Sequence, residues 1–316
     1  VYAIDVGETE RDTSTSGITV KGIDAQIASV LGVRKEDVRI HDMVAHPASQ
    51  SVYFSVTKGR GETAVPLLVR LTKRDKHVSV VSLDMIRHGR VELPDAASRD
   101  TMMPWEPAPR SFTMTHLAVG NGELYVAGLG NEEFKSTLRR VPLPFGKSAI
   151  TTHVEIYHTS HNRFETASPI KSLLPITLNG RSAVLASYTC SPLVVFDRDA
   201  LSGSGVVRGK TVAELGGGNR PFDMITYKSP RNGKEYVMIA NSHRTLMRFD
   251  LSDIASAPSM TTPVKQAYQP GGVQYLPVAS YGVLELDNYN SQNLIVLDRN
   301  AADGSLDLET VGLNWL

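Results

Sequence analysis

The sequence contains a single cysteine, Cys190, among its 316 residues. One cysteine excludes an intramolecular disulfide, so the fold has to be held together by its core. An excess of charge is also missing, because 33 basic residues balance 33 acidic ones. A neutral chain is a poor partner for nucleic acid or for an anionic membrane surface. No run of 18 apolar residues is present, and we therefore expect no membrane span.

Helical patterns are equally scarce, and only one segment near the N-terminus has the spacing of an amphipathic helix. This segment reads "GIDAQIASVLGVRKEDV" and starts at Gly22. Asp24 is the predicted N-cap, and Gly32 is the predicted stop signal. Elsewhere the apolar residues alternate, which is typical of strands. The sequence therefore predicts an all-β protein with one short helix.

A strand that ends at aspartate recurs in the second half of the chain. Its copies read "LVVFDRD" from Leu193, "LMRFDLSD" from Leu246 and "LIVLDRN" from Leu294. Two further apolar segments precede each copy, and two earlier, looser copies begin near His41 and Met114. The first strands of the units lie at intervals of 73, 56, 52 and 49 residues, near Asp42, Thr115, Lys171, Asp223 and Gly272.

Units of about 40–50 residues with several strands each are typical of β-propeller blades. One small sheet cannot bury both of its faces alone, whereas neighbouring blades cover each other. Dividing 316 residues by this period predicts one propeller domain over residues 1–316 with six blades. Seven blades follow if the long first interval holds another one. We expect "VYAIDVG" at the N-terminus and "LDLETVGLNWL" at the C-terminus to close the ring.

One repeat, "RPFDMITYKSPRNGKEYVMIANSHRTLMRFD" from Arg220 to Asp250, resembles the YVTN-type repeats of secreted bacterial propellers. The shared features are a proline, a hydrophobic strand, a Tyr-Val pair, Ala-Asn and a Phe-Asp ending. Two other units resemble this family loosely. The resemblance implies export, and Val1 in place of an initiator methionine fits a processed chain, so we expect a periplasmic or secreted protein. The resemblance says little about the chemistry of this protein, because one fold hosts many functions.

The loops on one face of a propeller commonly carry its binding residues. Asp42, Asp223 and Lys171 occupy matching positions at the starts of three blades. With His243 on a facing loop, the two aspartates form a candidate catalytic set for acid–base work. The simpler interpretation is that these aspartates hydrogen-bond the adjacent backbone.

The densest group of candidate ligands is "YHTSHNRFET", which contains His158 and His161. Imidazoles bind zinc and copper well, and His41 and His116 add candidates from other blades. On a straight strand residues three apart point in opposite directions, so the pair needs a turn. For each histidine taken alone, loop hydrogen bonding is the simpler interpretation. Cys190 is either a copper ligand or a nucleophile, although a small half-buried residue is the favoured interpretation.

Charged and polar loop residues indicate an anionic ligand. Arg163, Arg220 and Arg244 carry guanidinium groups, which recognise carboxylates and phosphates. The remaining ligand-binding candidates are Lys171, Asp287 and Asn288. Pairing of the arginines with carboxylates of neighbouring blades is an equally good interpretation. Calcium is a third candidate ion beside copper and zinc, because Asp287, Asn288, Glu132 and Glu133 offer oxygen ligands.

Three hypotheses about function follow. The first is an exported β-propeller that binds a small anionic molecule, a metal ion or both at its central channel. The second is a metal-assisted hydrolase or lyase with a central His/Asp/Arg site. The third is a platform for a protein partner. No Gly-x-Ser-x-Gly motif is present, and the sequence leaves open whether the protein is an enzyme.

Overall fold

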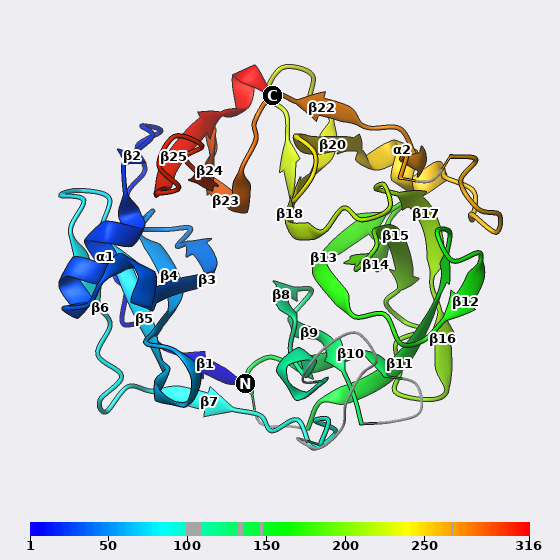
Figure 1. Ribbon diagram of the computed structural model, residues 1–316, viewed down its shortest axis with the longest axis horizontal. Coiled ribbons are helices and arrows are strands. Elements are labelled where there is room, and N and C mark those ends of the chain that lie inside the picture. The colour runs from blue at the N-terminus through cyan, green and yellow to red at the C-terminus, as the bar shows by residue number, and fades with distance from the viewer. Residues whose placement is uncertain (99–108, 132–134, 146–147, 267) are drawn as a thin grey trace. The chain divides into compact units, whose positions relative to one another are not determined.

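The computed structural model describes residues 1–98, 109–131, 135–145, 148–266 and 268–316 (Figure 1). Glu132 and Glu133, two of the calcium candidates, lie outside these residues. The chain divides into two compact units. Unit 1 comprises residues 1–3, 89–226 and 235–277, and unit 2 comprises residues 4–88, 227–234 and 278–316. The predicted all-β propeller architecture is confirmed, since the described residues form five blade-like sheets.

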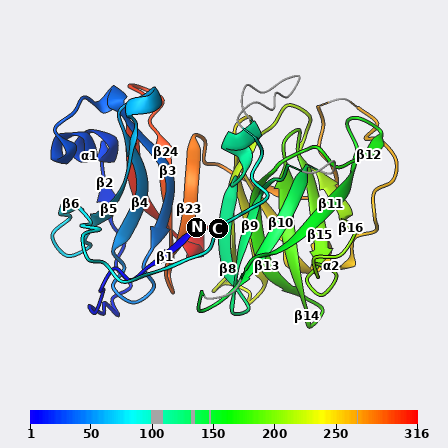
Figure 2. The ribbon, with the colours of Figure 1, turned by 90° about the horizontal axis from the view of Figure 1, so that it is seen from below.

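Unit 1 contains three blades, which we call A, B and C (Figures 1 and 2). Blade A consists of β8 (His116–Gly120), β9 (Glu123–Leu129), β10 (Ser136–Pro142), β11 (Ile150–His158) and β12 (Arg163–Glu165), with β16 (Val206–Arg208) beside β11. Blade B consists of β13 (Ile170–Leu178), β14 (Arg181–Tyr188), β15 (Pro192–Asp197), β17 (Lys210–Glu214) and β21 (Gly271–Gly272). Blade C consists of β18 (Pro221–Lys228), β19 (Glu235–Asn241), β20 (Leu246–Asp250) and β22 (Leu276–Val278).

Blade B is buried on both faces, and its sequence shows why. Successive residues of a strand point to opposite faces. Val184 and Ala186 of β14 belong to a core that also contains residues of blade A. Ala183 and Leu185, one position along, belong to a second core that contains residues of blade C. The strand is therefore apolar at four successive positions, from Ala183 to Ala186, instead of at every second one.

Unit 2 contains two blades, D and E. Blade D consists of β3 (Val38–Ala45), β4 (Val52–Lys58), β5 (Val65–Leu71) and β6 (Val78–Val80). Blade E consists of β2 (Thr19–Val20), β25 (Leu306–Gly312), β24 (Asn293–Arg299) and β23 (Val283–Asn290). A separate ribbon pairs β1 (Tyr2–Ile4) with β7 (His88–Arg90), and single 3-10 turns occupy Lys35–Asp37, Gly61–Thr63, Pro109–Phe112 and Leu313–Trp315.

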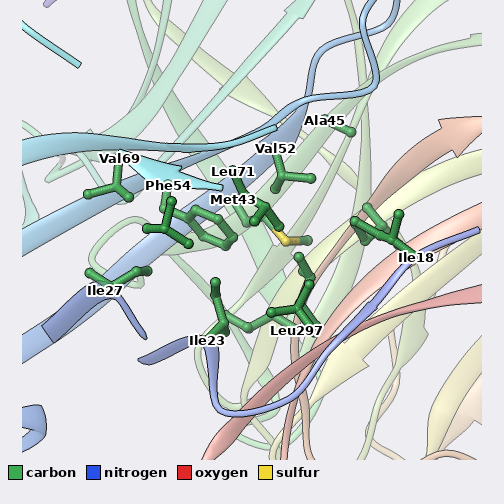
Figure 3. Packing of buried hydrophobic residues seen from close by; sticks show 14 of the residues in the cluster. Ile18, Ile23, Ile27, Met43, Ala45, Val52, Phe54, Val69, Leu71 and Leu297 are labelled. Atoms are coloured by element: carbon green, nitrogen blue, oxygen red, sulfur yellow. The ribbon is translucent and has the colours of Figure 1, made fainter. Parts of the chain in front are cut away.

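The helix predicted near the N-terminus is α1 (Ile23–Leu31), and it packs on the core of unit 2. Figure 3 shows Ile23 and Ile27 of α1 together with Phe54 and Leu297, which belong to the same cluster. Gly32 ends the helix in the left-handed conformation, with φ of 63°, as predicted. Asp24 is not the N-cap: this position belongs to Gly22, and Asp24 lies in the first turn.

A second helix, α2 (Leu251–Ser256), follows β20 directly and was not predicted. Its cap is Asp250, whose side chain accepts a hydrogen bond from the backbone of Ser252 at 2.9 Å. The Asp250-Leu-Ser252 sequence that reads as a strand ending is therefore also a helix start. Neither helix is long and apolar enough to cross a bilayer.

The prediction of six or seven blades is wrong, because the described residues form five. The long first interval contains four prolines between residues 94 and 109. Proline cannot donate a hydrogen bond to a sheet, so this stretch lengthens the interval without the pattern of another blade. At the chain ends, β2 pairs with β25 through Thr19 and Glu309, whereas β1 pairs with β7.

Candidate metal centre

The two histidines of "YHTSHNRFET" meet at a tight turn between β11 and β12 in blade A. The amide of His161 donates to the carbonyl of His158 at 3.1 Å, and Asn162 has a positive φ of 52°. Asparagine tolerates this conformation well. The turn brings the two imidazole rings to 3.9 Å between centroids. A straight strand would have separated them.

Glu165 holds both rings from the next strand. Its Oε2 lies 2.6 Å from Nδ1 of His158, and its Oε1 lies 2.7 Å from Nδ1 of His161. Nε of Arg163 donates to the same carboxylate at 2.7 Å. Burial alone raises the pKa of Glu165, but the hydrogen bonds from His158 and Arg163 lower it well below its usual range.

An ionised carboxylate only accepts hydrogen bonds, so Glu165 requires both Nδ1 atoms to be donors. In neutral imidazoles the two Nε2 atoms are then acceptors with an available lone pair. Nε2 of His158 is buried and has no hydrogen-bond partner, and the residue is only 1% exposed. An unpartnered buried polar atom is costly, and its retention needs a reason.

Cys190 of blade B reaches this pair of rings. Its thiol and one nitrogen of each imidazole lie within 4.8 Å of one another. Cys190 is in a turn between β14 and β15, in which the amide of Ser191 donates to the carbonyl of Tyr188 at 3.0 Å. Both Cys190 and Ser191 have positive φ, at 61° and 83°. Such backbone strain in non-glycine residues is often found at functional sites.

The electrostatic surroundings of the thiol are mixed. Burial and the charges of Glu214 and Glu165 raise the pKa of Cys190, and the charge of Arg220 lowers it in part. Glu214, at the end of β17, is 1% exposed and accepts a hydrogen bond from Oγ1 of Thr159. Burial raises the pKa of Glu214 against the effects of Thr159 and His158. A buried carboxyl group of this kind is a candidate proton donor.

His158, His161 and Cys190 thus offer two imidazole nitrogens and one sulfur, which is a donor set suited to zinc or copper. Calcium prefers oxygen ligands. Within the part of the chain that the structure describes, this is the one group of three such side chains close enough to share an ion. The carboxylate behind the two histidines resembles the outer partners that orient metal-bound imidazoles.

The other predicted residues of unit 1 do not join this group. His116 lies 3.3 Å from Asp223, and both side chains are largely buried. Asp223 also accepts a hydrogen bond from the amide of Met224 at 2.8 Å. Nζ of Lys171 lies over the ring of Phe112, 4.6 Å from its centroid. His116 thus makes a polar contact with Asp223 and Lys171 a cation–π contact with Phe112.

The predicted residues of unit 2 mostly bind backbone. Asp42 accepts from the amide of Met43 at 2.8 Å. Asp287 accepts from Ala45 at 2.8 Å and from Asn288 at 2.7 Å. Nε2 of His41 lies 2.6 Å from Oγ1 of Thr57, and burial lowers its pKa. The backbone hydrogen bond of Asp42 agrees with the simpler interpretation given above, in which the aspartates at the blade starts bind the adjacent backbone.

The remaining candidates surround a glycine loop, Gly216–Asn219, between β17 and β18. Oγ of Ser191 donates to Gly216 at 2.6 Å and to Asn219 at 3.1 Å. The amide of His243 donates to Oδ1 of Asn219 at 3.1 Å, and Oγ of Ser242 lies 2.5 Å from Nδ1 of His243. Arg220 and Arg244 flank this loop at positions described further below.

A scan against protein-family models finds no matching family, and a search of curated proteins finds no significantly similar sequence. The assignment of a function therefore depends on the geometry of the site.

Proposed function

We propose that this protein binds one transition-metal ion through His158, His161 and Cys190, with Glu165 orienting the two imidazoles. The observation that carries this proposal is the unpartnered Nε2 of His158. Its Nδ1 is fixed by Glu165 at 2.6 Å, while Nε2 is buried and bonded to nothing. A metal ion would satisfy this atom, which no side chain among the described residues does.

The donor set favours zinc and copper. Two imidazoles and a thiolate with weak further ligation are typical of copper centres, and three protein ligands with an open position are typical of catalytic zinc. The centroids of the two imidazole rings lie 3.9 Å apart. His161 is the more mobile candidate, since 43% of its side chain is exposed against 1% for His158. We expect His161 to rotate outward when the ion enters.

Metal content and affinity test this proposal. Protein stripped with a chelator should take up one equivalent of Zn²⁺ or Cu²⁺ in equilibrium dialysis. Co²⁺ should give the charge-transfer absorption of a thiolate ligand. His158→Ala and Cys190→Ser should each lower the affinity by more than the roughly 10–100-fold that an outer partner contributes.

The matched control is His77→Ala, which removes an exposed histidine from unit 2. This variant should keep full metal content. Cys190→Ser is nearly isosteric, so its folding is expected to survive. Metal uptake below one equivalent, or equal affinity in the wild type and in both site variants, would overturn the proposal.

A second candidate function is metal-assisted hydrolysis or a lyase reaction. Glu214 favours it, because a buried carboxyl with a raised pKa lies close to the ligands. A metal-loaded enzyme should hydrolyse an activated ester or phosphate ester. Glu214→Gln should abolish this turnover and leave the metal content unchanged. Turnover that persists in Glu214→Gln excludes Glu214 as the proton donor.

Export to the periplasm or to the exterior remains part of this proposal. The likeness of residues 220–250 to YVTN-type repeats supports it, and a single cysteine is compatible with an oxidising compartment. Expression with a secretion signal should give protein of normal metal affinity.

A further inference from the structure

Around the candidate metal centre the negative charges are buried and the positive charges are exposed. The two carboxylates, Glu165 and Glu214, are buried: the side chain of Glu165 is 10% exposed, and Glu214 as a whole residue is 1% exposed. Both already accept hydrogen bonds from neighbouring side chains. The exposed charges are cationic, because Arg163 is 70% exposed and Arg220 is exposed as well. A ligand that approaches from solvent therefore meets positive charge first.

The glycine loop Gly216–Asn219 lies between the turn that contains Cys190 and the side chain of Arg244. Its carbonyl groups bind Ser191, the residue after Cys190. On its other side, a Cβ atom at position 216 would lie 2.7 Å from Nη2 of Arg244. Gly216 has φ of 102°, and a Cβ atom there would also lie 2.9 Å from the carbonyl oxygen of Tyr268, so both the conformation and the close backbone require glycine. Gly216 thus allows Arg244 to lie against the loop.

Arg244 and Arg220 have guanidinium N–H donors that are not used in hydrogen bonds to the described residues. Arg244 uses Nη2 to bind the carbonyl of Tyr268 at 2.7 Å, but its Nε is buried without a partner. Arg220 makes backbone hydrogen bonds to Ser242, and its guanidinium forms no ion pair with any residue in the described ranges. Unpaired guanidinium groups beside a site recognise carboxylates and other oxyanions.

We infer that the open position of the metal centre takes a small oxyanion, a carboxylate or a phosphate, that Arg220 and Arg244 bind at its other end. This inference rests on the proposed metal centre. Three protein ligands leave a coordination position free, and one oxygen of the anion would fill it. The two arginines come from the loops before β18 and between β19 and β20 of blade C. Blades A and B would supply the metal, and blade C would supply the anion specificity.

Cobalt-loaded protein provides a direct test. Sodium oxalate and sodium phosphate are titrated separately at constant ionic strength, and the visible absorption of the bound Co²⁺ reports ligand exchange. We expect a saturable change with one anion per cobalt for at least one of the two salts. The tighter salt assigns the ligand to the carboxylate or the phosphate class.

Substitution separates the anion site from the metal site. Arg220→Gln and Arg244→Gln should each weaken anion binding about tenfold or more, the usual effect of losing a charge-assisted hydrogen bond. Both variants should keep one cobalt per chain. Arg181→Gln is the matched control, because Arg181 is exposed at the opposite end of β14 from Cys190, and it should change the affinity less than twofold.

The outcomes are distinguishable. If cobalt does not bind at one equivalent, the metal centre itself is overturned, together with this inference. If cobalt binds but neither salt changes the spectrum, the metal centre stands and the anion site is overturned. The same conclusion follows if both arginine variants bind the anion as tightly as Arg181→Gln.

Discussion

Two glutamates of blade A, Glu123 and Glu165, have largely buried side chains. Three residues donate to Glu123 and four donate to Glu165, but the two sets of donors differ in the polar atoms that they leave without a partner. Glu123 accepts hydrogen bonds from Arg140 at 2.7 Å, from Arg198 at 2.8 Å and from Tyr125 at 3.0 Å. Glu165 accepts them from His158, His161, Arg163 and Ser168. Around Glu123 the charges and hydrogen bonds are matched. Around Glu165, Nε2 of His158 remains buried without a partner.

The difference follows from the chemistry of the donors. Arginine and lysine have donors only, so a carboxylate can satisfy them and complete a structural network. Histidine has a second ring nitrogen on the far side, which the carboxylate turns into an acceptor. A glutamate beside arginines is therefore a structural anchor, whereas a glutamate beside histidines is placed to act as the outer partner of the metal site proposed above. The nature of the donor, more than the depth of burial, distinguishes the two roles.

The largest expected effect is on stability, at Glu123. Glu123→Ala leaves Arg140, whose side chain is 7% exposed, buried without a counter-charge. Breaking a buried pair in this way costs about 3–5 kcal/mol of unfolding free energy, which urea denaturation measures. Asp199→Ala is the control, because this 88% exposed carboxylate also binds Arg198. Equal stabilities of the two variants would contradict the structural role of Glu123.

The next effect is on metal affinity, at Glu165. Glu165→Gln removes the charge that orients both imidazoles, and we expect affinity for Zn²⁺ to fall about 10–100-fold. Competition with a chromophoric chelator measures it. Glu155→Gln, on β11 of the same hairpin, is the control, since the Glu155 carboxylate pairs with Arg208. The comparison with Glu123 fails if Glu123→Ala lowers metal affinity as much as Glu165→Gln does.

A smaller effect concerns pH in the metal-free protein. The folded-state pKa of Glu165 is lowered, so its stabilisation is present above the unfolded value, about 4.3, and is lost as the pH falls towards the folded pKa. Glu214 has a raised pKa, so its stabilisation is present below the unfolded value and is lost as the pH rises through the folded pKa. Urea denaturation from pH 3 to pH 7 should therefore show opposite trends for the two Glu→Gln variants relative to wild type. Parallel trends would refute this assignment.

The strands of the blades could be predicted because alternation and strand endings are local features. β15 ends at Asp197 and β20 ends at Asp250, where the repeated pattern places strand endings. The blade count could not be derived by division, since the intervals between units are unequal and the first, at 73 residues, is much longer than the others. The second helix was missed because Asp250 ends a strand and caps α2 at once.

Only part of the site could be predicted. The spacing of His158 and His161 identified a pair that needs a turn, and Cys190 was placed in a loop between strands. Their meeting depends on a left-handed residue, Cys190, and on the packing of blade A against blade B. No sequence pattern encodes either feature. Glu214 was missed altogether, because an acidic residue at a strand end usually is exposed.

The smallest expected effect is at Arg163, the exposed member of the Glu165 cluster. Its side chain is 70% exposed, although Nε lies 2.7 Å from the carboxylate. Solvent screening limits such a pair to less than about 1 kcal/mol, so Arg163→Ala should barely change the unfolding free energy, and added salt should remove the difference. Arg198→Ala on Glu123, where the arginine is 30% exposed, should cost more. If Arg163→Ala is the more destabilising of the two in urea denaturation, the exposed arginine anchors Glu165 more firmly than the histidines do, and the contrast between the two clusters fails.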